Sequence, residues 1–229
     1  MKKTIATIAL AAFALMPSYA QSYKRSKYYN RNSHRLEYGS RTRANYRSND
    51  VYYGLRIGPA FTTVSSDNKY LDGSKNKTGL NVGFAFGVEL SDPLYFETGL
   101  YYTEKGGKNN KANLDFTYGL NYLELPFVLK YVYEIDDFSI QPFFGGYFAC
   151  GVGGKIKNFE NRKAYSSFNN DYATEFNRVD AGLRMGVGFS VDMFYADLTY
   201  DLGLANIGND DFDECHSRAL MLTFGVNFE

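Results

Sequence analysis

The stretch GLNVGFAFGVEL, residues 79–90, alternates two kinds of side chain without a break. Side chains along a β-strand point to opposite faces in turn, so a period of two predicts a strand. One face is wholly apolar and comprises Leu80, Val82, Phe84, Phe86, Val88 and Leu90. The other face is small or polar, and its glycines, Gly83 and Gly87, weaken a strand unless a neighbour packs close to them. The crowded interior of a narrow barrel provides such neighbours.

Seven further stretches after residue 50 repeat this alternation. The eight predicted strands are 51–64, 79–90, 94–105, 119–133, 138–152, 178–191, 194–204 and 218–228. Four connections between them are long and polar, namely 65–78, 106–118, 153–177 and 205–217, whereas three are short, namely 91–93, 134–137 and 192–193. Long loops that alternate with tight turns are typical of outer-membrane barrels. We therefore predict an all-β fold, an eight-stranded antiparallel up-and-down transmembrane β-barrel.

The tight turns keep the apolar residues of successive strands on one face. A two-residue turn, Asp192-Met193, places Val191 opposite Phe194 and brings the apolar sets of both strands to the same side. The other two short turns preserve the face in the same way. Because a slip of one residue would invert a strand, this agreement supports the predicted pairing.

The second face of the strands combines charge with glycine. We predict that its charged residues form a network inside the barrel, and these are Arg56, Glu89, Glu97, Glu124, Lys130, Asp180, Arg184, Asp197 and Asp201. Arg or Lys at the bilayer midplane costs about 2–4 kcal/mol, and the apolar face avoids such charges. A soluble barrel with its apolar face inward is the alternative, but it would expose many glycines to water without any packing in return. Side chains just fill the lumen of an eight-stranded barrel, so we expect the apolar face to meet lipid.

The residues before the first strand divide into two segments. A basic start, an apolar run at 5–15 and small residues ending at Ala20 are typical of a secretory signal with cleavage after Ala20, and the run is too short to span a membrane as a helix. Residues 21–50 are strongly basic and nearly free of aliphatic side chains, which predicts a disordered periplasmic tail. The predicted domains are a signal peptide at 1–20, the tail at 21–50 and the barrel at 51–229.

Aromatic residues make up 17% of the chain, and several fall on the apolar face close to the tight turns. We predict that five of them form a periplasmic aromatic girdle, namely Tyr53, Tyr133, Phe138, Phe194 and Phe228. Such rings favour the membrane interface, although aromatic residues are also frequent in ordinary strands. Two cysteines, Cys150 and Cys215, fall near the same ends of their strands. An exported chain with this pair has either a disulfide or two free thiols.

Several segments taken together resemble the PorT-like family of outer-membrane β-barrel domains of Bacteroidota. They are Gly54-Leu-Arg-Ile-Gly58, Phe96-Glu-Thr-Gly-Leu100 with the following residues to Lys105, Asn121-Tyr-Leu-Glu-Leu-Pro126 with Leu129-Lys130-Tyr131, Asp180-Ala-Gly-Leu-Arg184 and Phe224-Gly-Val226. The resemblance covers about residues 51–229 and implies an eight-stranded barrel in the outer membrane. A founding member of that family serves a secretion system that exports proteins with a C-terminal sorting domain.

Few residues suggest catalysis or ligand binding. The two histidines, His34 and His216, are far apart in the sequence, so they do not suggest a paired metal site. His216 and Ser217 lie beside acidic residues in the last long loop, but adjacent residues form a catalytic triad only if their side chains converge in space. We therefore predict no enzymatic activity, no catalytic residue, no cofactor and no metal site.

The predicted function is a structural or accessory role in envelope assembly or protein secretion, with the lumen filled by side chains. Two alternatives stay open, a narrow porin-like solute channel and a lipid-modifying outer-membrane enzyme that uses His216. Predicted partners are outer-membrane lipids, together with envelope or secretion-system proteins that contact the external loops or the basic tail, and no nucleic acid is expected. The predicted location is the bacterial outer membrane with both termini in the periplasm.

Overall fold

The computed structural model describes residues 50–66, 71, 75–111, 114–159, 163–169, 174–212 and 214–228. The predicted signal peptide and nearly all of the predicted basic tail lie outside the described residues, as does Asp213 of the last loop. Among the residues described, none belongs to a helix long and apolar enough to cross a membrane.

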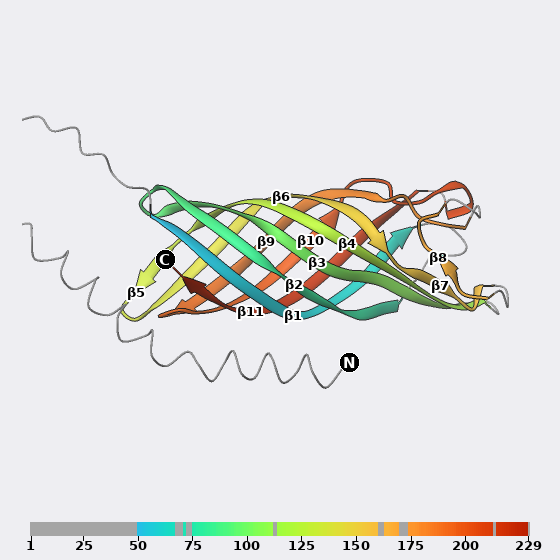
Figure 1. Ribbon diagram of the computed structural model, residues 1–229, viewed down its shortest axis with the longest axis horizontal. Coiled ribbons are helices and arrows are strands. Elements are labelled where there is room, and N and C mark those ends of the chain that lie inside the picture. The colour runs from blue at the N-terminus through green and yellow to red at the C-terminus, as the bar shows by residue number, and fades with distance from the viewer. Residues whose placement is uncertain are drawn as a thin grey trace, which may run out of the picture. The chain divides into compact units, whose positions relative to one another are not determined.

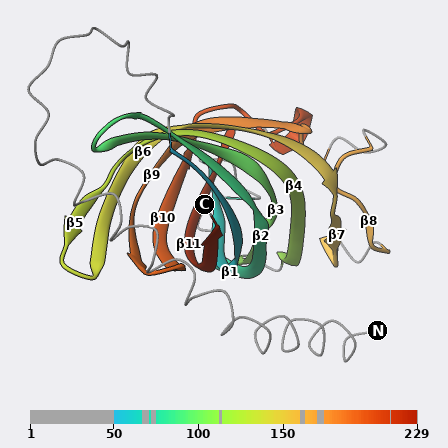
Figure 2. The ribbon, with the colours of Figure 1, turned by 60° about the vertical axis from the view of Figure 1, so that its left-hand side comes forward.

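Eight long antiparallel strands close into a barrel (Figures 1 and 2). They are β1 (Val51–Ser66), β2 (Lys75–Ser91), β3 (Leu94–Lys111), β4 (Leu114–Tyr131), β6 (Phe138–Gly153), β9 (Val179–Val191), β10 (Phe194–Gly203) and β11 (Cys215–Phe228). Each of these strands pairs with the next along the chain, and β1 pairs with β11 to close the wall. Tyr53 lies opposite Phe228 in that pair, so the first strand begins where the last one ends. The predicted fold class is confirmed.

The apolar face of the wall points outward. On β2, Phe84 and Leu90 are exposed, whereas Asn81 is buried on the inner face. Gly87 is also on the inner face, directly opposite Tyr52 of β1, and a Cβ atom at Gly87 would overlap the Tyr52 ring. The glycines of the inner face therefore make room for large rings on the neighbouring strand.

The tight turn between β9 and β10 has the predicted register. Val191 lies opposite Phe194 across Asp192-Met193, and pairing continues without a shift along both strands. Asp192 adopts a left-handed φ of 52°, a conformation that Asp tolerates because its short polar side chain bonds to the local backbone. The two strands thus present their apolar sets to the same side.

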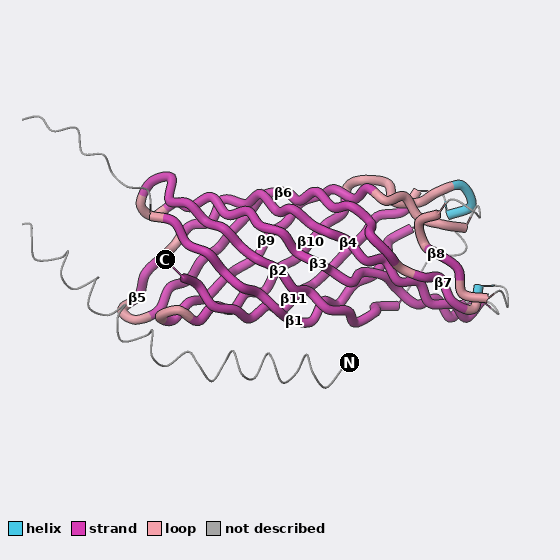
Figure 3. The backbone as a smooth tube through the Cα atoms, in the orientation of Figure 1, coloured by secondary structure: helices cyan, strands magenta, loops and turns pink. Residues whose placement is uncertain are grey.

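Several strands run further than the alternation predicted. β5 (Tyr133–Ile135) pairs with the start of β6, so that turn consists of residues 136–137 alone. β3 and β4 remain paired up to Lys111 opposite Leu114. The prediction of a loop at 106–118 is therefore wrong, because most of this segment is a β-hairpin (Figure 3). Lysine, glycine and asparagine on both faces of this hairpin hide the period of two.

The loop end of the barrel, opposite the tight turns, carries a compact apolar core that we call the cap. β7 (Lys155–Lys157), β8 (Tyr165–Ser166) and the 3-10 helix η3 (Asp210–Phe212) lie there (Figures 1 and 3). The buried residues of the cap are Val64, Leu71, Phe116, Tyr118, Leu120, Tyr122, Tyr147, Ala149, Ile156, Phe159, Phe168, Phe176, Ile207, Phe212 and Cys215. Segments predicted as polar loops therefore fold back onto the end of the barrel.

Candidate functional site

The inner face of the wall carries two clusters of ion pairs, and the first lies nearer to the tight turns. In this turn-side cluster, Glu97 accepts hydrogen bonds from Lys130 Nζ at 2.6 Å and from the Tyr52 hydroxyl. Arg56 Nη2 stands 4.0 Å from Glu97 and donates a hydrogen bond of 2.6 Å to Asn227 Oδ1. Because desolvation of a charge is costly, such buried groups depend on their partners.

The ring of Tyr195 is a platform shared by the two cations of the turn-side cluster. The guanidinium carbon of Arg56 lies 3.9 Å from the ring centroid and Lys130 Nζ lies 4.6 Å from it. The same ammonium donates to the Tyr195 hydroxyl at 3.1 Å. A desolvated cation–π contact contributes about 2 kcal/mol, so the ring stabilises two neighbouring positive charges.

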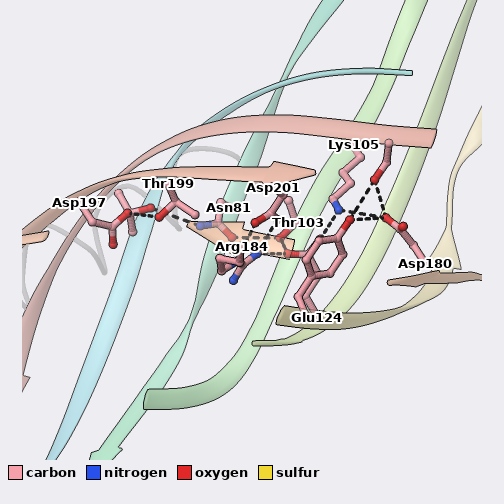
Figure 4. Close-up of polar contacts among 12 residues, drawn as sticks. Asn81, Thr103, Lys105, Glu124, Asp180, Arg184, Asp197, Thr199 and Asp201 are labelled. Atoms are coloured by element: carbon pink, nitrogen blue, oxygen red, sulfur yellow. Dashed lines mark hydrogen bonds and ion pairs between the residues drawn. The ribbon is translucent and has the colours of Figure 1, made fainter. Parts of the chain in front are cut away.

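Glu124 is the centre of the second, loop-side cluster (Figure 4). Its Oε1 lies 2.7 Å from Lys105 Nζ, and its Oε2 accepts hydrogen bonds from Arg184 Nη2 at 2.8 Å and Thr103 Oγ1 at 3.0 Å. Arg184 also binds Asp201, its direct cross-strand neighbour, through two hydrogen bonds of 2.7 and 2.6 Å. Bidentate contacts between a guanidinium and a carboxylate are both strong and directional.

Asp180 extends the loop-side cluster toward the cap (Figure 4). Its Oδ2 lies 3.2 Å from Lys105 Nζ and accepts hydrogen bonds from Ser217 Oγ at 2.6 Å and the Tyr147 hydroxyl at 3.2 Å. Lys105 Nζ also lies 4.4 Å from the ring centroid of Tyr147 and 5.5 Å from that of Tyr122. Since both rings belong to the cap, the cap continues directly into the charged lumen.

A small cavity separates the two clusters. It has a volume of about 20 Å³, and its lining includes Glu97 from one cluster, Arg184 from the other, and Asp197 and Thr199 between them. Asp197 Oδ1 accepts a hydrogen bond of 2.8 Å from Thr199 Oγ1, and within the described part of the chain Asp197 forms no ion pair. A cavity of this size holds about one water molecule, so side chains leave little open space between the two clusters.

The structure brings most of the predicted inner charges together. Seven of them belong to the two clusters, namely Arg56, Glu97, Glu124, Lys130, Asp180, Arg184 and Asp201. Asp197 is buried beside the cavity. Glu89 lies outside the network, half-buried near the tight turns, and it makes no ion pair with any described residue. The pairing of β2 with β3 shifts between Glu89 and Ser91, at the rim of the wall, where a carboxylate can meet water.

Lys105 is the buried cation that the predicted network lacked. It is 1% exposed on the inner face of β3, two residues after Thr103 and in phase with Glu97. Strand parity was the signal that could have placed it inside, but its position at the end of a predicted strand, beside a glycine- and lysine-rich segment, suggested a loop. With Lys105, the buried lumen charges comprise the cations Arg56, Lys105, Lys130 and Arg184 and the carboxylates Glu97, Glu124, Asp180, Asp197 and Asp201.

The residues of the predicted girdle all point outward near the tight turns. Their exposed fractions range from 41% to 57%, and they are Tyr53, Tyr133, Phe138, Phe194 and Phe228. Tyr53 also packs against Phe84 and Phe86 of β2, with ring centroids 5.9 and 5.4 Å away. Adjacent rings thus cover the outer wall at this level.

The two cysteines do not form the disulfide that the sequence allowed. Both thiols are free in the structure. Cys150 is exposed on the outer face of β6, whereas Cys215, the first residue of β11, is buried in the cap. Their side chains lie on opposite sides of the wall, which prevents a bond between them.

His216 and Ser217 are adjacent in β11, and their side chains point to opposite faces, as successive residues of a strand do. His216 Nδ1 lies 3.0 Å from the Ala205 carbonyl oxygen and Nε2 lies 3.4 Å from Glu214 Oε1. Ser217 donates to Asp180 on the inner side of the wall. Among the residues that the structure describes, no three potential metal-binding side chains converge.

A closed wall with an apolar outer face and a charged, filled lumen defines a membrane β-barrel. The chain matches the family model described as outer membrane protein beta-barrel domain over residues 19–209. It therefore belongs to this family, and its location is the bacterial outer membrane. Among curated proteins, none matches the chain.

Similar solved structures are small barrels of bacterial outer membranes. The attachment invasion locus protein Ail of Yersinia pestis is 18% identical, with 77% of this chain and 98% of that chain covered and a TM-score of 0.44. Neisserial surface protein A is 17% identical over 78% of this chain and 99% of that chain, with a TM-score of 0.46. OprG of Pseudomonas aeruginosa is 14% identical over 79% of this chain and 97% of that chain, with a TM-score of 0.42.

Proposed function

We propose that the chain is a non-conducting outer-membrane barrel with a structural or accessory role in envelope assembly or protein secretion. In this proposal the loop end and its cap face outward and both termini lie in the periplasm, as is general for barrels with long loops and short turns. The proposal includes cleavage of the signal peptide after Ala20, a periplasmic tail at 21–50 and affiliation with the PorT-like proteins within the family.

The filled lumen is the single observation that supports this proposal most directly. Two ion-pair clusters and the cap follow one another along the barrel axis, with only a cavity of about 20 Å³ between the clusters. Removal of one partner from a buried ion pair costs about 3–5 kcal/mol, so these groups resist separation by a passing solute. A barrel closed in this way acts through its surfaces, namely the cap, the lipid-facing wall and the tail.

Conductance in planar bilayers tests the closed lumen. We expect the purified barrel to give no discrete current steps above the leak of the lipid alone. The narrow channel is the second candidate, favoured by the cavity beside Asp197. If steps occur and Thr199→Phe, which fills the cavity, abolishes them while the outward-facing Leu198→Phe does not, then the channel replaces the closed barrel.

Affinity isolation from native outer membranes tests the accessory role. We expect the full-length chain to retain an envelope or secretion-system protein and a chain without residues 21–50 to lose it. A matched control keeps the length of the tail but replaces Arg41, Arg43 and Arg47 with Gln, which separates the effect of charge from that of length. Identical sets of retained proteins for the full-length and deleted chains would contradict a partner that binds the tail.

We also propose that the protein is not an enzyme. The opposite orientation of His216 and Ser217 supports this, because a nucleophile and its base must share one site. Lipid extracts from cells that produce the wild-type protein and His216→Ala should therefore have identical acyl compositions. A product that forms with the wild type alone would establish a lipid-modifying activity.

A further inference from the structure

Three exposed lysines form a row across the extended strands at the loop end. Lys75 of β2 lies directly opposite Lys108 of β3, Lys108 lies opposite Thr117 of β4, and Thr117 lies opposite Lys157 of β7. Residues that pair directly across antiparallel strands present their side chains to the same face. We call Lys75, Lys108 and Lys157 the lysine row, in which Thr117 is the uncharged position.

The lysine row lies on the outer face of the wall. Thr117 alternates with Phe116 and Tyr118, which are buried in the cap, so Thr117 and its cross-strand neighbours face away from the cap. Lys157 likewise follows the buried Ile156 on β7. The row is therefore on the same side of the sheet as the lipid-facing residues further along the strands.

Further lysines raise the positive charge of this face. Lys77 Nζ donates to the Lys105 carbonyl oxygen at 3.3 Å, and its charge interacts with those of Lys108 and Lys157. Lys155 is exposed two residues before Lys157. The nearby carboxylates on this face are Glu104, which interacts with Lys77, and the exposed Asp115. Among the residues that the structure describes, five lysines thus face two carboxylates.

This arrangement is unfavourable for the isolated protein. Like charges directly opposite each other on paired strands are destabilising, and Lys75 stands directly opposite Lys108. The described charges of the buried lumen nearly balance, whereas the described charges of this outer face do not. An anionic ligand with more than one phosphate would neutralise the row, because each ammonium group offers three donors to phosphate oxygens.

The position of the lysine row points to a lipid as that ligand. Leu80, on the outer face of β2, marks the loop-side edge of the apolar band, and Lys75 lies five residues further. At about 3.3 Å per residue along a tilted strand, the row stands above the hydrocarbon at the level of polar headgroups, and flexible lysines reach back toward it. We propose that the lysine row binds the phosphate groups of an anionic glycolipid in the outer leaflet. This inference rests on the proposed outward orientation of the loop end.

Native mass spectrometry of the full-length barrel in detergent tests this inference. The probes are bis-phosphorylated lipid A, the same lipid A with both phosphates removed, and inorganic phosphate. We expect the wild type to retain the phosphorylated lipid and Lys108→Gln/Lys157→Gln to retain it about tenfold less. The control Lys108→Arg/Lys157→Arg keeps the charge and should retain lipid as the wild type does, and Arg218→Gln removes an exposed cation outside the row.

Equal retention of phosphorylated lipid by the wild type and by Lys108→Gln/Lys157→Gln would overturn the inference. So would equal retention of the dephosphorylated lipid, or full competition by inorganic phosphate. Heat-modifiable gel mobility of every variant shows whether the barrel is folded. Labelling of Lys163→Cys, an exposed position of the loop end, with a membrane-impermeant maleimide in intact cells tests the orientation separately. Labelling without lipid retention would reject the lysine row and leave the proposed function standing.

Discussion

Two lysines three positions apart on β3 have opposite environments. Lys105 Nζ lies in the lumen between Glu124 and Asp180, whereas Lys108 stands exposed in the lysine row. Strand parity separates them, since residues an odd number of positions apart face opposite sides of a sheet. The same side chain therefore neutralises buried carboxylates at one position and adds to surface charge at the other.

Replacement of these two lysines should have very different effects on stability. Lys105→Met leaves Glu124 and Asp180 short of a cation in a dry lumen, so we expect the free energy of unfolding to fall by about 3–5 kcal/mol. Lys108→Met should change it by less than about 0.5 kcal/mol, as is usual at the surface. Urea unfolding in phospholipid vesicles, followed by tyrosine fluorescence, measures both, and equal midpoints would contradict the buried role of Lys105.

The close packing around the glycines of the inner face predicts that alanine substitutions there will lower stability. A methyl group at Gly87 would collide with the Tyr52 ring, whereas one at Gly153 would meet no atom within 4 Å. We expect Gly87→Ala to lower stability by about 1–3 kcal/mol and Gly153→Ala to have little effect. Heat-modifiable gel mobility gives the folded fraction of each variant. If Gly87→Ala folds as well as Gly153→Ala, the position of the Tyr52 ring does not require the absence of a side chain at residue 87.

At the scale of elements, the alternation of side chains was sufficient to predict all eight barrel strands and their lipid-facing sides. The alternation failed where the strands extend beyond the bilayer. There the outer face meets water in place of lipid, so apolar residues are no longer required at every second position. The hairpin beyond Lys105 and the cap strands β7 and β8 belong to this part. Eight of the nine predicted inner charges are buried in the lumen, whereas Glu89 lies at the rim and Lys105 was missed. The pairing of the charges was not predictable, since Glu124 meets Arg184 only through closure of the barrel.

A charge on the outer face of β2 should destabilise the barrel according to its depth. Phe84 lies in the middle of the exposed apolar set of β2 and Leu80 lies at its loop-side edge. Phe84→Arg should cost about 2–4 kcal/mol, and Leu80→Arg about 0–1 kcal/mol. Reversible unfolding in lipid vesicles measures the difference between the two variants. An equal cost at both positions would show that Phe84 does not lie deeper in the bilayer than Leu80.

For the whole molecule, the cap is the feature that sequence patterns could not reveal. Phe116, Phe159, Phe176 and Phe212 come from four separate segments and meet with ring centroids 4.9 to 6.4 Å apart. Phe116 lies on the long strand β4, whereas the other three lie in segments too short to show an alternation of apolar and polar residues. Only the closed barrel brings these segments to one place, where they can exclude water as the core of a soluble protein does.

Loss of the cap should leave the barrel intact. We expect Phe176→Ala/Phe212→Ala to make the loop end of the reconstituted protein sensitive to protease, because each truncation costs about 3–5 kcal/mol of local packing. The folded form on heat-modifiable gels should persist, since both ion-pair clusters remain. Phe224→Ala, on the lipid-facing side, is the matched control and should stay protected. Protection of the cap variant equal to that of the control would argue against an independent cap.

The seam between β1 and β11 has a consequence for the timing of biosynthesis. It joins the first and the last barrel strand, with Gly54 opposite Asn227, and contacts between such distant residues form late in folding. Until the last strand has been synthesised and exported, the wall has two unpaired edges, which are prone to aberrant association. The barrel therefore cannot close before its last strand has been synthesised. Throughout that interval both edge strands present unpaired backbone groups to any other extended chain.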